Sequence, residues 1–327
     1  MDENKITEEH LSDPEQNDGS PGDKPAKKKK KSSVPLTVAL IVILLVGIGI
    51  MAYPTVSDWW NSYHQSRSIA DYISKVNEAD EELLEKMFED ARAYNAKLLQ
   101  KSNPYIVTDE DKAEYMSLLD FSGTGIIGYL QIDAIGVNLP IYHTTEESVL
   151  QTAVGHLEWS SLPVGGESTH ALLSGHRGLP SARLFTDLDS LHEGNIFTIT
   201  VLNKTLTYQI DQIRIVEPTE VKELNIVPGK DYCTLITCTP YGINTHRILV
   251  RGARIETVEK AAVIITPEAV RIPNYIAIPA VAVPMLFLLL LASMFIIPRK
   301  RSDFSDEELL EAIKRDEPDE NENKPTE

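Results

Sequence analysis

The pattern of apolar and polar residues contains two long uncharged segments, at 34–53 and 275–297. A helix rises about 1.5 Å per residue, so about 20 residues span the hydrocarbon core of a bilayer, which is about 30 Å thick. Uncharged runs of this length are rare inside soluble proteins. The second segment contains Pro279 and Pro284, which a membrane helix tolerates. We therefore expect two transmembrane helices.

Positive charges beside the two segments predict their orientation. Lys27–Lys31 precedes the first segment and Arg299–Arg301 follows the second. Because cationic flanks remain in the cytoplasm, both termini are expected there and residues 54–274 outside the cell. A cleaved signal peptide fits the first segment less well, since its leader is long and acid-rich and no clear small-residue cleavage site follows.

The region between the two segments changes from helical to strand-like periodicity. Residues 57–101 place apolar side chains three to four positions apart, and Ser102-Asn103-Pro104 ends this helical pattern. From Ile126 onward the apolar runs are short, and Ile196–Ile210 is typical of two strands joined by a turn at Asn203-Lys204. Many short strands at close spacing predict a sandwich or a closed barrel.

We therefore expect a mainly β protein with helices before the β domain. The expected organisation is a disordered cytoplasmic tail (1–33), a transmembrane helix (34–53), a helical segment (54–122), a β domain (123–258), a linker (259–274), a second transmembrane helix (275–297) and an acidic cytoplasmic tail (298–327).

Charge and cysteine content exclude several functions. The net charge is -18, which argues against nucleic acid as a partner because phosphate binding needs a clustered cationic surface. Two cysteines are too few for a disulfide scaffold or a four-thiolate metal site. The sequence lacks the CxxC, HExxH and phosphate-loop patterns. We expect neither a metal nor a cofactor.

Cys238 is the strongest candidate for chemistry. It ends an apolar run that Thr239-Pro240 stops, and a thiol at the end of a strand is accessible to a substrate at the sheet rim. In one strand Cys233 and Cys238 would lie about 16 Å apart on opposite faces, which is too far for a disulfide. We expect Cys233 to be buried and inert, and Cys238 to be reactive.

A reactive thiol needs a nearby cation, because free cysteine, with a pKa of about 8.5, is mostly protonated at neutral pH. His176 ranks first because it follows an apolar run in a polar break similar to the one at Cys238, and His170 and His143 rank behind it. Arg247 begins the next strand. In an antiparallel pair it would lie about 5 Å from Cys238 between Cα atoms, where it could stabilise a thiolate and an oxyanion. A surface salt bridge is an equal alternative for Arg247.

These residues lie in segments that resemble the sortases, and most closely the class C, pilin-polymerising sortases of Gram-positive bacteria. With the preceding helices the resemblance covers most of the outer region, and the second uncharged segment also fits class C. The segments are LPIYHTT (Leu139–Thr145), VGHLEWSSLPVGG (Val154–Gly166), THALLSGHRGLPSARLFTDL (Thr169–Leu188) and TLITCTPYGINTHRILVRG (Thr234–Gly252).

The resemblance implies an eight-stranded sortase β-barrel and a set of roles. Cys238 would be the nucleophile, His176 the general acid and base, and Arg247 the oxyanion-stabilising or substrate-positioning residue. The thiolate would cleave the Thr–Gly bond of an LPXTG-like sorting signal, forming a thioester that a lysine amine of a pilin resolves as an isopeptide. The remaining histidines of these motifs would be structural: His143, His156 and His170.

One motif departs from the family pattern. Class C members commonly cover the site with a lid that carries an Asp-Pro-aromatic motif, whereas this sequence has Asn103-Pro104-Tyr105. Asparagine cannot supply the carboxylate of a charged latch, although Tyr105 could still fill the cleft. We therefore expect a lid without that ionic latch.

Three alternatives remain open. A sortase could attach surface proteins to cell-wall peptidoglycan instead of polymerising pilins. A hydrolytic cysteine protease would release the free acid even with a lysine acceptor present. A membrane-tethered adhesion or scaffold domain would function without Cys238.

Overall fold

The computed structural model describes residues 34–257 and a few positions after them. The chain divides into two compact units, Met1–Ile50 and Met51–Glu327. Several expected segments lie outside the described residues, namely the two tails (1–33 and 298–327), the linker (259–274) and the second span (275–297), apart from isolated positions.

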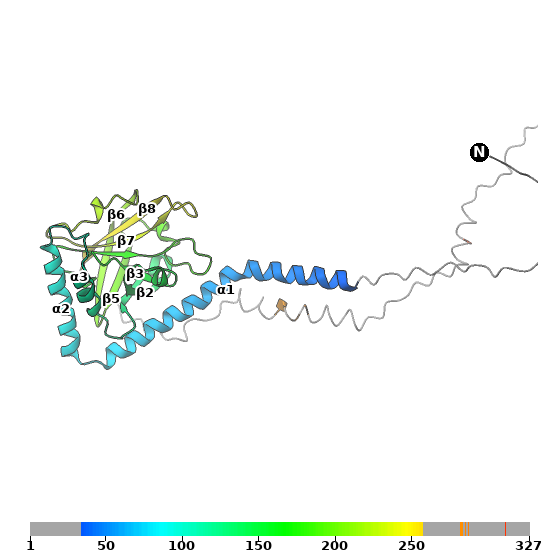
Figure 1. Cartoon of the computed structure of the whole chain (residues 1–327), viewed down its shortest axis with the longest axis horizontal. Coiled ribbons are helices and arrows are strands. Elements are labelled where there is room, and N and C mark those ends of the chain that lie inside the picture. Colours follow the sequence, from blue (N-terminus) through cyan, green and yellow to red (C-terminus); the bar gives the residue numbers. More distant parts are fainter. Residues whose placement is uncertain (1–33, 258–281, 284, 286, 288–310, 312–327) are drawn as a thin grey trace, which may run out of the picture. The chain divides into compact units, whose positions relative to one another are not determined.

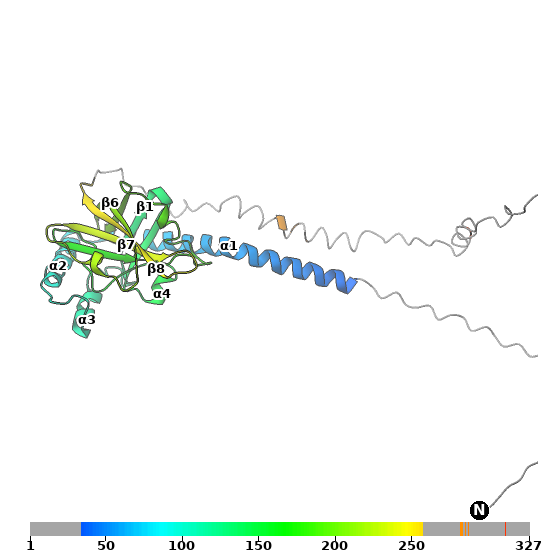
Figure 2. The same cartoon turned by 90° about the horizontal axis from the view of Figure 1, so that it is seen from above.

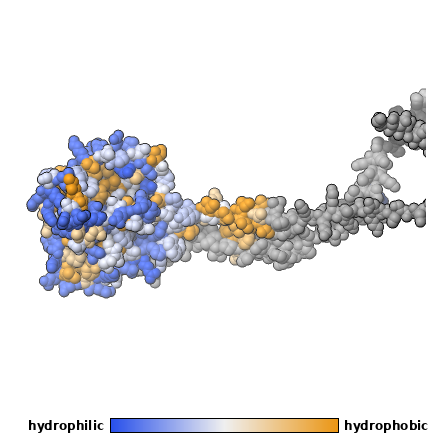
Figure 3. All heavy atoms as spheres, viewed as in Figure 1, coloured by the Kyte–Doolittle hydropathy of each residue, from blue (hydrophilic) through white to orange (hydrophobic). Residues whose placement is uncertain are grey.

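The first expected span is part of a longer helix, α1 (Val34–Glu78). Apolar side chains here are exposed, such as Ile43 at 67% and Met51 at 84%, and they form a hydrophobic patch along the helix (Figure 3). Among the described residues, α1 alone is long and apolar enough to cross a membrane. The helix does not end at residue 53 as expected. It continues through Pro54, which removes one backbone hydrogen bond.

The helical stretch predicted at 57–101 is two helices. α1 ends at Glu78, and α2 (Glu81–Leu99) begins after Asp80, whose side chain accepts a hydrogen bond from the backbone N–H of Glu82 at 2.9 Å. This N-cap satisfies a donor that has no partner within the helix. The apolar spacing alone did not reveal the break. A third helix, α3 (Asp109–Ser117), precedes the barrel.

The β domain is a closed barrel of eight strands, which confirms the predicted fold (Figures 1 and 2). Neighbouring strands follow the order β1-β2-β3-β4-β7-β8-β6-β5. The pairs β2–β3 and β4–β7 are parallel, and the others are antiparallel. The strands are β1 (Ile126–Ile132), β2 (Val137–His143), β3 (Val154–His156), β4 (Thr169–Ser174), β5 (Ile196–Val201), β6 (Lys204–Val216), β7 (Asp231–Thr239) and β8 (His246–Ile255).

Short helical turns connect several of these strands. The pair β5 and β6 is the predicted hairpin about Asn203-Lys204. The short elements are η1 (Asp133–Ile135), α4 (Glu147–Leu150), η2 (Leu188–Ser190) and η3 (Lys222–Leu224).

Polar anchors fix the helices against the barrel. Tyr72 of α1 is buried, and its hydroxyl accepts the backbone N–H of Leu202 at 2.8 Å. Asn95 of α2 is also buried. Its Nδ2 donates to the carbonyl of Leu162 at 3.0 Å, and its Oδ1 accepts the N–H of the same residue at 2.7 Å. Because burial makes an unpaired polar group costly, these bonds specify where α1 and α2 pack.

We expect Asn95→Leu to destabilise the protein by about 3 kcal/mol, because it leaves both backbone groups of Leu162 buried without their partner. Chemical denaturation of the full chain in detergent measures this loss. Asn77→Leu, at an exposed position of α1, is the matched control and should change stability by less than about 0.5 kcal/mol. Equal effects of the two substitutions would contradict the anchoring role of Asn95.

Candidate active site

β7 lies at the centre of the candidate site, between β4 and β8. It carries both cysteines, and both are free thiols. Cys233 is fully buried in the barrel core, and this burial raises its thiol pKa well above the ordinary value. Cys238 is partly exposed near the end of the strand. The predicted contrast between a buried cysteine and an accessible one is therefore confirmed.

Arg247 pairs with Cys238 across β7 and β8. The two residues are direct partners in the antiparallel register, as the sequence predicted, so their Cα atoms lie about 5 Å apart. The Arg247 guanidinium donates through Nη1 to the backbone carbonyls of Asn244 at 3.2 Å and His246 at 3.0 Å. These carbonyls hold the cation beside the strand end without neutralising its charge.

His176 follows β4, the strand on the other side of β7 from β8. In the parallel register of β4 and β7, Ser174 is the partner of Ile236. The N–H of Gly175 continues this ladder by donating to the carbonyl of Ile236 at 3.1 Å. β4 ends at Ser174, two residues before His176, and Cys238 comes two residues after Ile236 in β7. Because the two strands are parallel, His176 and Cys238 follow at the same end of the sheet.

The imidazole of His176 has a buried ring nitrogen, Nε2, that lacks a hydrogen-bond partner among the described residues. Its side chain is 28% exposed, and Nε2 lies 3.6 Å from Oε2 of Glu147 on α4. Glu147 was not singled out in the sequence, because its position on a short helix between β2 and β3 carries no pattern that indicates proximity to His176.

The other candidate histidines are structural. His156 is buried, with Nδ1 3.0 Å from the hydroxyl of Tyr115 and Nε2 2.8 Å from the carbonyl of Ser161. His143 packs edge-on against the same tyrosine ring. His170 lies with Nδ1 2.9 Å from the carbonyl of Asn225 and Nε2 2.7 Å from Oγ1 of Thr234.

Burial keeps these histidines neutral. It lowers the pKa of both His156 and His170 to about 4, and it also lowers the pKa of His143. His156 and His170 are also hydrogen-bonded on both ring nitrogens, so neither has a free nitrogen to take up the proton of a thiol. His176, by contrast, is partly exposed in the loop that follows β4.

An apolar floor extends from Cys238 along the same face of the sheet. Side chains two residues apart in a strand share a face, so Ile236 lies on the face of Cys238 and its partner Leu249 on that of Arg247. These two belong to a second hydrophobic cluster, separate from the barrel core, against which Trp159 packs. The cluster comprises Leu172, Val216, Leu224, Ile236 and Leu249.

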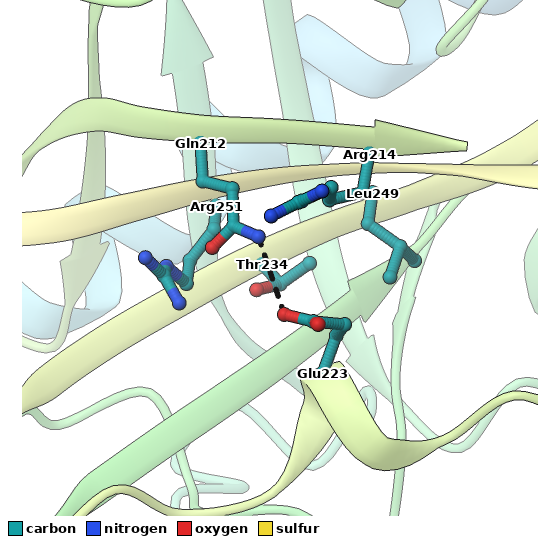
Figure 4. Close-up of a pocket in the computed structure, with 6 residues that line it drawn as sticks. All are labelled: Gln212, Arg214, Glu223, Thr234, Leu249 and Arg251. Atoms are coloured by element: carbon teal, nitrogen blue, oxygen red, sulfur yellow. Dashed lines mark hydrogen bonds between the residues drawn. The ribbon is translucent and has the colours of Figure 1, made fainter. Parts of the chain in front are cut away.

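Farther from Cys238 this face becomes polar. A small pocket lies between β6, β7, β8 and the segment before β7 (Figure 4). Within it the side-chain amide of Gln212 donates a hydrogen bond to the carboxylate of Glu223 at 3.2 Å. Thr234 on its floor lies four residues before Cys238, which is about 13 Å along a strand. An extended peptide of about four residues would therefore reach from the pocket to the thiol. The pocket is lined by Gln212, Arg214, Glu223, Thr234, Leu249 and Arg251.

The segment Asn103-Pro104-Tyr105 covers part of this face. The Tyr105 ring packs edge-on against Trp159, with centroids 4.9 Å apart, and its hydroxyl donates to Oδ1 of Asn225 in the loop before β7. The side chain of Asn103 accepts the N–H of Tyr105 at 3.1 Å. Asn103 thus shapes the turn, while the tyrosine makes the contacts. Neither Trp159 nor Asn225 was singled out as a contact of this segment in the sequence.

Known proteins with similar sequences and structures share this architecture. A family model described as the sortase domain matches residues 130–255. The crystal structure of sortase C1 from Streptococcus agalactiae is 51% identical, covers 59% of this chain and 100% of its own, and has a TM-score of 0.58. That of Streptococcus pneumoniae sortase C is 43% identical, covers 59% and 99%, and has a TM-score of 0.54.

The curated relatives are more distant. Sortase A of Streptococcus agalactiae serotype III (strain NEM316) is 33% identical over 137 residues, which are 41% of this chain and 55% of that protein. The chain therefore spans about half the length of this relative. Sortase A of Staphylococcus aureus (strain NCTC 8325 / PS 47) is 25% identical over 66% of this chain and 92% of its own.

We expect stability to fall as the pH is lowered from about 6.5 to 4. Between these values the unfolded chain binds a proton at His156 and His170 while the folded chain does not, so protonation favours unfolding. Each histidine contributes about 3 kcal/mol over the full interval. Denaturation of the full chain across this range measures the slope of the unfolding free energy against pH. This slope should be smaller in His170→Gln and unchanged in His192→Gln, since His192 is exposed. Identical slopes in all three proteins would refute this origin of the acid sensitivity.

We expect Tyr105→Ala to increase the alkylation rate of Cys238 several-fold, because the substitution removes the ring that packs on Trp159, which in turn packs against the apolar floor. Tyr105→Phe keeps the contact with Trp159 and loses the hydrogen bond to Asn225, so its rate should be intermediate. The control is Ile106→Ala, since Ile106 is 63% exposed. An unchanged rate in Tyr105→Ala would count against a covering role for this segment.

Proposed function

The chain belongs to the sortase family, whose members are cysteine transpeptidases, and we propose that it polymerises pilins as a class C sortase. The observation that supports this proposal is the register of β7, which pairs Cys238 with Arg247 and pairs Ile236 with Ser174, two residues before His176. The 51% identity with a sortase C1 over the whole of that structure supports class C. The related sortase C of Streptococcus pneumoniae is described in terms of pilin substrate specificity.

In the first proposed step, Cys238 attacks the Thr–Gly bond of an LPXTG-like sorting signal. The sulfur bonds to the threonine carbonyl carbon, and the peptide C–N bond breaks. His176 gives its proton to the departing amine. Arg247 donates hydrogen bonds to the oxyanion of the tetrahedral intermediate, and the carbonyls of Asn244 and His246 hold its guanidinium for this task.

In the second proposed step, a lysine amine of another pilin attacks the thioester. The new C–N bond is an isopeptide bond, the sulfur leaves as thiolate, and His176 takes the proton of the amine. The thiolate and imidazolium are thereby restored, so the two steps form a cycle that needs no cofactor.

Membrane attachment through α1 serves this reaction by proximity. α1 is long and apolar enough to span a bilayer, and confining enzyme and substrate to one surface raises their effective concentration. We further propose that residues 54–274 lie outside the cell and that both termini are cytoplasmic, with a second span at 275–297. The charges beside the two uncharged segments support this orientation.

We expect the full chain to convert pilins into a ladder of covalent multimers, and Cys238→Ala to abolish both the ladder and the thioester seen by mass spectrometry. Cys233→Ala is the matched control and should retain both products, because that thiol is enclosed in the core. His176→Ala should reduce thioester formation by about a hundredfold or more.

Other products would identify the alternatives. Transfer of a surface protein to a peptidoglycan amine without pilin multimers would indicate an anchoring sortase. Free acid as the sole product with a lysine acceptor present would indicate a protease. A wild-type phenotype in Cys238→Ala would indicate a scaffold and would refute the proposal.

A further inference from the structure

Arg177, the residue after His176, has an environment unlike that of a surface arginine. Its side chain is 9% exposed, and it forms an ion pair with Asp189 of η2. Its Nη1 donates to Oγ1 of Thr239 at 3.2 Å, and Tyr241 lies beside the guanidinium, with its ring centroid 5.9 Å from Cζ. A nearly buried cation that contacts two separate segments, η2 and the end of β7, is a costly feature, which indicates a specific role.

The bond between Arg177 and Thr239 lies one residue beyond the candidate reactive pair. The ladder between β4 and β7 ends with the Ser174–Ile236 pair and the bond of Gly175 to Ile236. His176 and Arg177 follow Gly175 on one side, and Cys238 and Thr239 end β7 on the other. Thr239 is buried, and side chains of successive strand residues point to opposite faces. The side chain of Arg177 therefore contacts the side chain of Thr239 on the face opposite to that of Cys238.

No regular strand pairing holds the chain at this point. β4 ends at Ser174, and residues 175–187 form a loop without helix or strand. The N–H of Phe185 donates to the carbonyl of His176 at 3.1 Å, and Oγ1 of Thr237 donates to the carbonyl of Gly175 at 2.7 Å. The side chain of Arg177 adds the link between this loop and the residue next to Cys238.

We propose that Arg177 is a positioning residue that holds the His176 imidazole within reach of the Cys238 thiol. The inference rests on the proposed function, because it assigns a task within the same reaction. Arg177 acts through the loop and through Thr239, and it does not contact the substrate. Asp189 orients the guanidinium and balances its charge, while Arg247 remains the cation on the substrate side.

The test compares kcat, KM and the pH dependence of Cys238 alkylation in the full chain. Arg177→Gln should lower kcat for cleavage of an LPXTG peptide about 10-fold to 100-fold, because a misplacement of about 1 Å has effects of this size. KM should stay within about twofold, since the apolar floor is unchanged. The pH dependence of Cys238 alkylation should change, because the imidazole of His176 would no longer be held beside the thiol.

Three further variants separate positioning from general stability. Arg177→Lys should recover part of kcat, because one ammonium reaches one of the two partners but not both. Thr239→Val removes the hydroxyl that accepts the hydrogen bond of Arg177, whereas the ion pair of Arg177 with Asp189 remains. The change in the pH dependence of Cys238 alkylation should therefore have the same direction as in Arg177→Gln but be smaller. Arg183→Ala breaks an exposed ion pair with Asp187 in the same loop and should leave kcat and the alkylation midpoint unchanged.

The outcomes distinguish this inference from the proposed function. A wild-type alkylation midpoint in both Arg177→Gln and Thr239→Val would overturn the positioning role, as would a fall in kcat that only matches the loss of folded protein in thermal melting. If the wild-type enzyme forms no thioester with sorting peptides, the proposed function fails. The alkylation comparison would still decide whether Arg177 places His176 beside Cys238.

Discussion

The hydrogen-bond register of β7 against β4 and β8 is the constraint on which the site depends. The side-chain period of a strand is two residues, so a slip of one residue would turn Cys238 into the barrel and bring Thr239 to its surface. The register is fixed from within, because Leu235, Leu173 and Val250 are completely buried in the core. Closure of the barrel adds to this, since no strand is left with a free edge.

The parallel pairing of β4 with β7 gives the site its asymmetry. The antiparallel neighbour β8 returns directly from Cys238, so Arg247 reaches its place through a short connection. The parallel neighbour needs a long connection, and the chain between β4 and β7 includes β5 and β6. His176 therefore lies at the start of a loop rather than in a hairpin, and its position needs additional side-chain contacts.

Local patterns in the sequence predicted the parts of the site that depend on one strand or one turn. The alternation of side-chain faces along β7 predicted that Cys233 is buried and Cys238 accessible. The short segment between Cys238 and Arg247 predicted that these two residues pair across β7 and β8. Contacts between distant segments had no such signal in the sequence. The local context ranked His176 first among the histidines, and the family resemblance strengthened its assignment as the partner of Cys238. The position of Glu147 near His176 and the contacts of Tyr105 with Trp159 and Asn225 join segments that are far apart in the chain, which a single sequence does not display.

The chemical nature of the Tyr105 contacts determines how they respond to ionic strength. A carboxylate–guanidinium latch weakens as ionic strength rises, because mobile ions screen exposed charges within a Debye length of about 8 Å in physiological salt. An aromatic edge contact and a hydrogen bond between neutral groups carry no net charge to screen. The contacts of Tyr105 with Trp159 and Asn225 therefore persist in concentrated salt, where an ionic latch would weaken.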